Sequence, residues 1–254
     1  MKARSSSNSS PPVQVMIIDD SALIRQSLSK LIDCTPGMQV MATAADPYFA
    51  VQKLRKAVPD VITLDIEMPR MDGLSFLQKL MQQHPIPVVV ISSLSDKGTA
   101  NAIRALELGA VDVLLKPRLD TIEARNAAKV QLAEVLAAAA KANPRKRSGK
   151  LMPVTQKHTA DAVIQKRRSN KAMLQTTEKV VAIGASTGGT EAISQVLRAL
   201  PHDSPGIVIV QHMPAYFTSA FAERLNNLCR INVREARSND SVLRGQALIA
   251  PGER

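Results

Sequence analysis

The chain has 254 residues, 45% of them apolar, and a formal net charge of +11. This length and apolar content allow one or two domains with a sizeable core, and the scarcity of aromatic residues makes that core aliphatic. Its two cysteines are isolated, which excludes a disulfide framework and a cysteine metal site and favours the cytoplasm. No apolar run approaches the ~18 residues of a membrane span, so no transmembrane segment is expected.

The positive charge is concentrated in one part of the chain. Residues 121–178 hold 12 Lys and Arg against 4 Asp and Glu, which accounts for +8 of the net charge. No helix-turn-helix pattern or aromatic stacking platform lies beside them, so we expect a basic linker and no nucleic-acid partner. Two interpretations stay open: a solvated spacer, and a tether that lingers near acidic membrane surfaces or acidic receptor tails.

Residues 1–12 are expected to form a disordered tail, and regular alternation begins at residue 13. Short apolar runs predict strands, and three-to-four spacing predicts the helices between them. The expected strands are 13–18, 39–44, 61–65, 87–92 and 112–115, with helices at 21–33, 47–57, 73–83 and 98–108 and a fifth from about 119. This order predicts an α/β fold, a doubly wound parallel (βα)5 sheet.

Charged and polar residues follow the strands of this predicted sheet. Strand one ends in Asp19 and Asp20, strand three in Asp65, strand four in Ser92 and strand five before Lys116. The carboxyl ends of parallel strands meet at one edge, where such folds place their sites. Three neighbouring carboxylates repel one another unless a cation lies among them, which indicates Mg²⁺. Any single one of these aspartates is equally interpreted as a strand end or a helix cap.

These residues occur in motifs that resemble the receiver domain of two-component response regulators, a flavodoxin-like fold. The resemblance covers residues 13–118 and is carried by Ile18-Asp-Asp-Ser21, Asp65-Ile-Glu-Met-Pro-Arg-Met-Asp-Gly73, Val90-Ile-Ser-Ser93 and Leu114-Leu-Lys-Pro117. It implies that a histidine kinase phosphorylates Asp65, and that Ser92 and Lys116 contact the phosphoryl oxygens. It also implies a Mg²⁺ site made of Asp19, Asp20, Asp65 and the backbone carbonyl of Glu67.

One position departs from the receiver pattern. Many receivers carry an aromatic residue three positions before the lysine, and here that residue is Val113. A switch based on an aromatic rotamer is therefore not expected, and Val113 is equally interpreted as an ordinary core residue.

Residues 119–178 are expected to form a helical extension, to about 140, followed by the basic linker. Alternation then resumes with a strand at 179–183, a helix at 190–200 and a strand at 207–210. Ser186 lies in a G-x-S-x-G sequence on the first strand-to-helix turn, which exposes a serine hydroxyl. His212 follows the next strand and is a candidate base, although a lone histidine there is more often structural. The glycine loop lacks the lysine of a phosphate loop and the second glycine of a dinucleotide fingerprint.

This second segment resembles the catalytic domain of chemotaxis protein-glutamate methylesterases. The resemblance is carried by Ile183-Gly-Ala-Ser-Thr-Gly-Gly189, Val210-Gln-His-Met-Pro214 and Gly245-Gln-Ala-Leu-Ile-Ala-Pro-Gly252. It implies that Ser186 is the nucleophile and His212 its general base. The implied substrates are glutamate methyl esters, and certain glutamine amides, on methyl-accepting chemoreceptors, and the esterase is expected to need no cofactor.

The resemblance also implies that residues 179–254 are the N-terminal part of a truncated catalytic domain. The third triad residue of the family is an aspartate further downstream and is expected to be absent from the chain; Asp203, Glu223 and Asp240 are expected to be merely solvated. Two functions stay open: a phosphorylation-regulated methylesterase, and a catalytically impaired form that acts only as a phosphoacceptor. A DNA-binding regulator ranks behind both.

Overall fold

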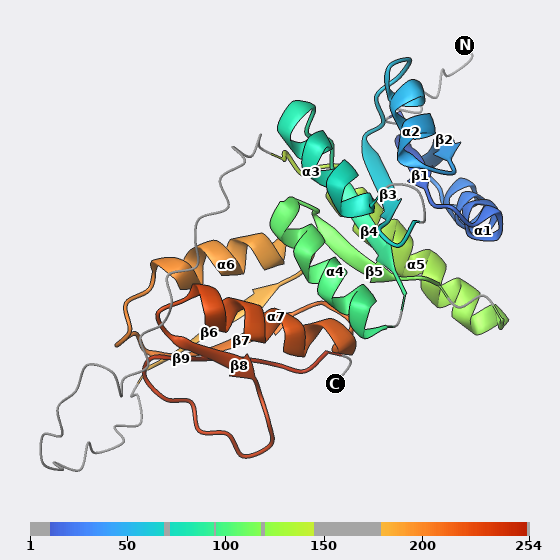
Figure 1. The fold of residues 1–254 in the computed structure, drawn as a ribbon. Coiled ribbons are helices and arrows are strands. Elements are labelled where there is room, and N and C mark those ends of the chain that lie inside the picture. The colour runs from blue at the N-terminus through green and yellow to red at the C-terminus, as the bar shows by residue number, and fades with distance from the viewer. Residues whose placement is uncertain (1–10, 69–71, 94, 118–119, 145–178, 253–254) are drawn as a thin grey trace, which may run out of the picture.

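A computed structural model describes residues 11–68, 72–93, 95–117, 120–144 and 179–252. It contains two parallel α/β units, which confirms the predicted fold class (Figure 1). Residues 1–10 of the predicted tail and 145–178 of the predicted linker lie outside the described residues. Within the described ranges, no helix has the length and apolarity that a membrane crossing requires.

The first unit is a five-stranded parallel sheet in the order β2-β1-β3-β4-β5. Its strands are β1 (Val13–Ile18), β2 (Met38–Ala44), β3 (Val61–Asp65), β4 (Val88–Ser92) and β5 (Asp112–Leu115). Its helices are α1 (Ala22–Asp33), α2 (Pro47–Leu54), α3 (Gly73–Gln83), α4 (Asp96–Leu108) and α5 (Ile122–Ala139). A side chain caps each helix start, because the first backbone N–H groups have no partner within the helix.

Helix α2 ends earlier than the sequence pattern predicts. We expected a helix over 47–57, but the helix ends at Leu54 and Arg55 caps it. Pro59 disfavours helical backbone at Val58, so the chain turns before that residue. The early end shortens the helix beside α3 and leaves Val58 70% exposed.

Two apolar clusters hold helices on both faces of the first sheet. On one face, Leu28 of α1 and Leu136 of α5 pack with Ile17 and Ile91 of the strands. The other cluster includes buried residues of α3 and α4, and it continues without a break into the second unit. The core of the first unit is therefore shared in part with its neighbour.

The second unit is a four-stranded parallel sheet in the order β6-β7-β9-β8. Its elements are β6 (Val180–Ala185), α6 (Gly189–Ala199), β7 (Gly206–Gln211), α7 (Ala215–Leu228), β8 (Asn232–Glu235) and β9 (Gln246–Ile249). The strand-helix-strand pattern over β6, α6 and β7 was predicted. Sequence reasoning did not identify α7, β8 or β9, because β8 is short and largely polar and a long turn separates it from β9.

Helix α4 joins the two units. It packs against α3, β4 and β5 of the first unit and against α6 and α7 of the second (Figure 1). Ala102 and Ala105 are fully buried, so the helix approaches its neighbours closely. An ion pair between Glu107 of α4 and Arg224 of α7 completes the contact.

The packing at Gly73 generates a prediction about stability. A Cβ atom there would lie 2.6 Å from the carbonyl oxygen of Asp65 and 2.7 Å from the Cα of Ile66. We expect Gly73→Ala to lower the free energy of unfolding by about 1–3 kcal/mol, because backbone must move. The control is Gly184→Ala, where no atom lies within 4 Å, and we expect a change below about 0.5 kcal/mol. Urea unfolding followed by circular dichroism measures both; equal effects would contradict the packing.

Candidate functional site

Three carboxylates gather at the carboxyl edge of the first sheet, where β1 and β3 are neighbours. One ligand oxygen each from Asp19, Asp20 and Asp65 lies within 4.8 Å of the others. Asp19 and Asp65 are buried and Asp20 is exposed. The parallel sheet thus brings together the three residues that the sequence analysis selected.

Lys116, which follows β5, reaches across this edge. Its Nζ lies 2.7 Å from Oδ2 of Asp65 and 3.9 Å from Oδ2 of Asp19. Burial lowers the pKa of Lys116, but the hydrogen bond and charge of Asp65, with the charges of Asp19 and Asp20, more than offset this and raise it. The lysine is therefore a fixed cation beside the candidate phosphoacceptor.

The surroundings of Asp19 oppose the ionisation of its carboxyl group. Burial, together with the charges of Asp65 and Asp20, raises the pKa of Asp19 to about 6, although the Ser21 N–H and Lys116 act in the opposite direction. Its Oδ2 is buried and accepts no hydrogen bond. A buried carboxylate oxygen without a donor, beside two further carboxylates, fits a hard divalent cation such as Mg²⁺.

Glu67 and Ser92 complete the edge. The N–H of Glu67 donates to Oδ1 of Asp65 at 2.9 Å, and the role of the Glu67 carbonyl as a metal ligand stays a prediction. Ser92 is fully buried, and its hydroxyl donates to the carbonyl of Gly98 in the first turn of α4 at 3.2 Å. The candidate phosphoryl-sensing hydroxyl is thereby tied to the helix that joins the two units.

Ser186 and His212 lie at the corresponding edge of the second sheet. Strands β6 and β7 pair in parallel with Ala185 opposite Gln211, so Ser186 and His212 each come one residue after a paired position. The N–H of His212 donates to the carbonyl of Ala185 at 2.9 Å. Both residues are exposed, and among the described contacts no side-chain hydrogen bond joins them. The sheet brings the pair to one edge, open to solvent.

Gln211 forms a hydrogen bond to the turn that carries Ser186. Its side-chain N–H donates to the Ser186 carbonyl at 3.0 Å, and the N–H of Gly189 donates to the same oxygen at 2.7 Å. Gly188 has φ +77°, where other residues are strained, and a Cβ at Gly189 would lie 2.6 Å from the Cβ of Ala185, so both positions favour glycine. Sequence reasoning did not assign Gln211 a role; a polar residue ending a buried strand was the available signal.

Asp112, at the start of β5, connects the first unit to the Ser186 turn. Its buried carboxylate accepts hydrogen bonds from the N–H of Val113 at 2.8 Å and from the Thr187 side chain, and it interacts electrostatically with His212. Burial raises the pKa of Asp112 despite these three interactions. Sequence reasoning missed this residue, although a lone carboxylate within an apolar strand was a visible signal.

The structure also shows the surroundings of Val113 and Asp240, two residues that the sequence analysis discussed. Val113 is 3% exposed and belongs to the apolar cluster that spans both units, which fits its interpretation as a core residue. Asp240 is more than merely solvated: Arg234 lies 2.5 Å away, and with the N–H of Arg237 it lowers the pKa of Asp240 to about 2.

Asp112 generates a prediction about pH. Because folding raises its pKa, the folded chain binds this proton more tightly than the unfolded chain. The resulting stabilisation is complete below the unfolded pKa of about 4 and is lost as pH rises through the folded pKa. Asp112→Asn keeps an acceptor oxygen and removes the charge, so we expect it to melt at or above the wild-type temperature at pH 7.5.

The difference in melting temperature between Asp112→Asn and wild type should shrink as the pH falls towards 4.5. Thermal unfolding followed by circular dichroism measures it. Asp120→Asn, at an exposed position, is the control and should leave the pH dependence unchanged. A less stable Asp112→Asn protein with a pH-independent gap would contradict the prediction.

Two family models match the chain. The response regulator receiver domain matches residues 15–127, and the CheB methylesterase matches residues 181–254. The receiver domain of Thermotoga maritima CheB is a similar solved structure, at 38% identity and TM-score 0.47 over 52% of this chain and 99% of that one.

Curated relatives match across both units. A protein-glutamate methylesterase/protein-glutamine glutaminase of Anaeromyxobacter dehalogenans is 55% identical over 97% of this chain and 68% of its own length. Another, from Geobacter metallireducens, is 54% identical over 95% of this chain and 68% of its own length. The chain therefore belongs to the family of protein-glutamate methylesterases/protein-glutamine glutaminases that carry a response regulator receiver domain.

Proposed function

We propose that the chain is a chemotaxis methylesterase whose hydrolysis of glutamate methyl esters is controlled by phosphorylation of Asp65. The same serine site is proposed to deamidate glutamines. One observation carries the proposal: the two units share an apolar core through α4. One unit carries the acidic edge with Lys116 bonded to Asp65, and the other carries Ser186 and His212 at one edge of its sheet. The relatives' names supply the two reactions.

The proposed domains follow from this assignment. They are a tail at 1–12, a receiver at 13–118, a helical extension and basic linker at 119–178, and a methylesterase part at 179–254. The proposed phosphodonor is a chemotaxis histidine kinase, and the proposed substrates are methyl-accepting chemoreceptors. Both interactions are proposed to take place in the cytoplasm.

In the receiver reaction, Asp65 is the proposed nucleophile. Its carboxylate oxygen attacks the phosphorus of phosphohistidine, the new O–P bond forms, and the N–P bond breaks with its electron pair leaving on the histidine. Receiver domains generally use Mg²⁺, which would be held by Asp19, Asp20 and Asp65 and would supply charge neutralisation at the phosphoryl oxygens. Lys116 is already at bonding distance from Asp65 and turns its ammonium to the new oxygens.

The proposed signal leaves the receiver through Ser92 and α4. A phosphoryl oxygen on Asp65 competes for the Ser92 hydroxyl, which in the described state is bonded to Gly98. Breaking that bond releases the first turn of α4, whose other surface packs against α6 and α7. Helix α6 begins two residues after Thr187, the residue that Asp112 holds. A shift of α4 and β5 therefore reaches the turn that carries the nucleophile.

In the esterase reaction, Ser186 is the proposed nucleophile and His212 the proposed base. His212 takes the hydroxyl proton while the serine oxygen attacks the ester carbonyl. Collapse of the tetrahedral intermediate breaks the bond to methoxide, which leaves as methanol with the proton from His212. Water then attacks the acyl-enzyme with His212 again as base, and glutamate and free Ser186 result. Backbone N–H groups at the start of α6 are the proposed oxyanion donors.

The receiver assignment predicts a single phosphorylation site. With acetyl phosphate and Mg²⁺, we expect the wild-type chain to be retarded on a phosphate-affinity gel. Asp65→Asn should abolish the retarded band, and removal of Mg²⁺ with EDTA should do the same. The exposed Asp120→Asn should behave as wild type. A retarded Asp65→Asn band of wild-type intensity would contradict the assignment.

The esterase assignment predicts methanol release from methylated receptor membranes. We expect acetyl phosphate to increase the release, Asp65→Asn to remove only that increase, and Ser186→Ala to lower release by about 10⁴-fold or to background. Ser219→Ala, an exposed serine on α7, is the matched control. Phosphorylation at Asp65 without any Ser186-dependent methanol would instead support the receiver-only alternative.

A further inference from the structure

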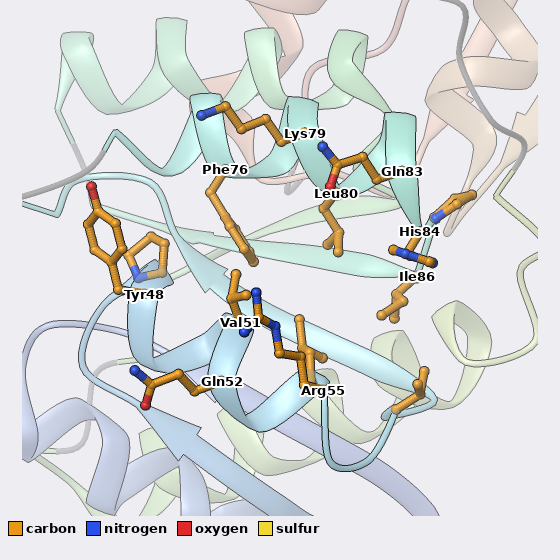
Figure 2. A pocket seen from close by; sticks show the side chains of 14 residues that line it. Tyr48, Val51, Gln52, Arg55, Phe76, Lys79, Leu80, Gln83, His84 and Ile86 are labelled. Carbon is orange, nitrogen blue, oxygen red and sulfur yellow. The ribbon is translucent and has the colours of Figure 1, made fainter.

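A groove lies between α2 and α3, on a part of the receiver that the proposed reactions do not use. Its volume is about 1020 Å³. Figure 2 shows Tyr48 and Val51 of α2 on one side and Phe76 and Leu80 of α3 on the other. Phe76, Leu80 and Ile86 are buried and form an apolar floor. Tyr48 is 61% and Val51 40% exposed, so the walls of the groove are apolar and accessible to solvent.

The charged residues that line the groove are cationic. Arg55, the C-cap of α2, and Lys79 of α3 are exposed on its rim, and His84 lies at one end (Figure 2). None of the 14 described residues that line the groove is Asp or Glu. An apolar floor between two cationic rims is complementary to an apolar segment with acidic flanks.

The dimensions fit a helix. Helix α2 has 8 residues and α3 has 11, so the groove runs along about 12–16 Å of helix at 1.5 Å per residue. That length matches two to three turns of a bound helix. All residues that line the groove belong to the first unit, and the main contacts of α6 and α7 with that unit are made by α4 (Figure 1).

We propose that this groove binds an acidic amphipathic helix of a partner protein. The apolar stripe of the helix would cover Val51, Phe76 and Leu80, and its flanking carboxylates would pair with Arg55 and Lys79. Because none of these residues belongs to the Asp65 edge, docking here does not require phosphorylation. The site would hold the enzyme beside a partner that need not be its substrate.

Other occupants fit the charges less well. Residues 1–12 contain Lys2 and Arg4 and no acidic residue, and residues 145–178 hold 9 Lys and Arg against 2 Asp and Glu. Both segments would bring positive charge to a positive rim. A second copy of the chain has +8 of its +11 net charge in residues 121–178, and that segment would meet the same repulsion.

Fluorescence anisotropy with the full chain tests the proposal. The probe is a fluorescein-labelled peptide of about four helical turns, with leucines at i, i+3, i+4 and i+7 and glutamates on the flanking positions. Two further probes are its counterpart with lysine for glutamate and a scrambled peptide of the same composition. We expect saturable binding of the acidic amphipathic peptide alone.

Variants locate the binding. The double substitution Arg55→Glu and Lys79→Glu should lower the affinity for the acidic peptide by about ten-fold or more and should create binding of the lysine peptide. Val51→Asp should abolish binding, because it places a charge under the apolar stripe. The control is Lys30→Glu with Arg125→Glu, exposed cations on α1 and α5, which should change affinity less than about two-fold.

Several results would overturn the proposal. They are no binding, equal binding of the scrambled peptide, or an affinity unchanged by Arg55→Glu with Lys79→Glu. A concentration-dependent dimer in sedimentation velocity that Val51→Asp abolishes would assign the groove to a second copy. Binding to phosphatidylserine vesicles that depends on Arg55 and Lys79, without peptide binding, would assign it to a membrane surface.

Discussion

The burial of α4 on two sides is the constraint on which the rest of the structure depends. The helix packs on β4 and β5 in the receiver and on α6 and α7 in the second unit. Fully buried alanines at 102 and 105 leave little free space around it. Close-packed interiors move between discrete arrangements rather than deforming smoothly. In the proposed signalling route, a change at the Ser92–Gly98 bond would therefore shift α4 as a unit and reach α7.

The acidic edge illustrates how a functional site opposes stability. Asp19 is buried with one oxygen that accepts no hydrogen bond, while Lys116 already bonds to Asp65. Lys116 bonds to only one of the three carboxylates, so their mutual repulsion is not fully compensated in this partly buried place. A purely structural edge would have little reason to keep this arrangement, whereas a site that binds a metal ion and a phosphoryl group needs it.

Much of this organisation could be predicted from the sequence, for a specific physical reason. Parallel strands end at one edge, so Asp20, Asp65 and Lys116 could be placed together from strand order alone. The contact of Asp112 with Thr187 could not, because it depends on how two units pack rather than on any local period. The α2–α3 groove also escaped prediction, since it depends on where α2 ends. Strand β8 was missed because its polar residues give no apolar run.

Strand β5 has a mechanical consequence of its own. It carries Asp112 at its first residue, and Lys116 directly follows its last; at about 3.3 Å per residue, some 13 Å separates the two. This short strand thus carries Asp112, which contacts the Ser186 turn, at one end, and Lys116, which contacts Asp65, at the other. Because side chains alternate along a strand, inserting a single residue here would turn one end to the opposite face. The length of β5 is therefore fixed by both sites at once, and neither site can change its register there alone.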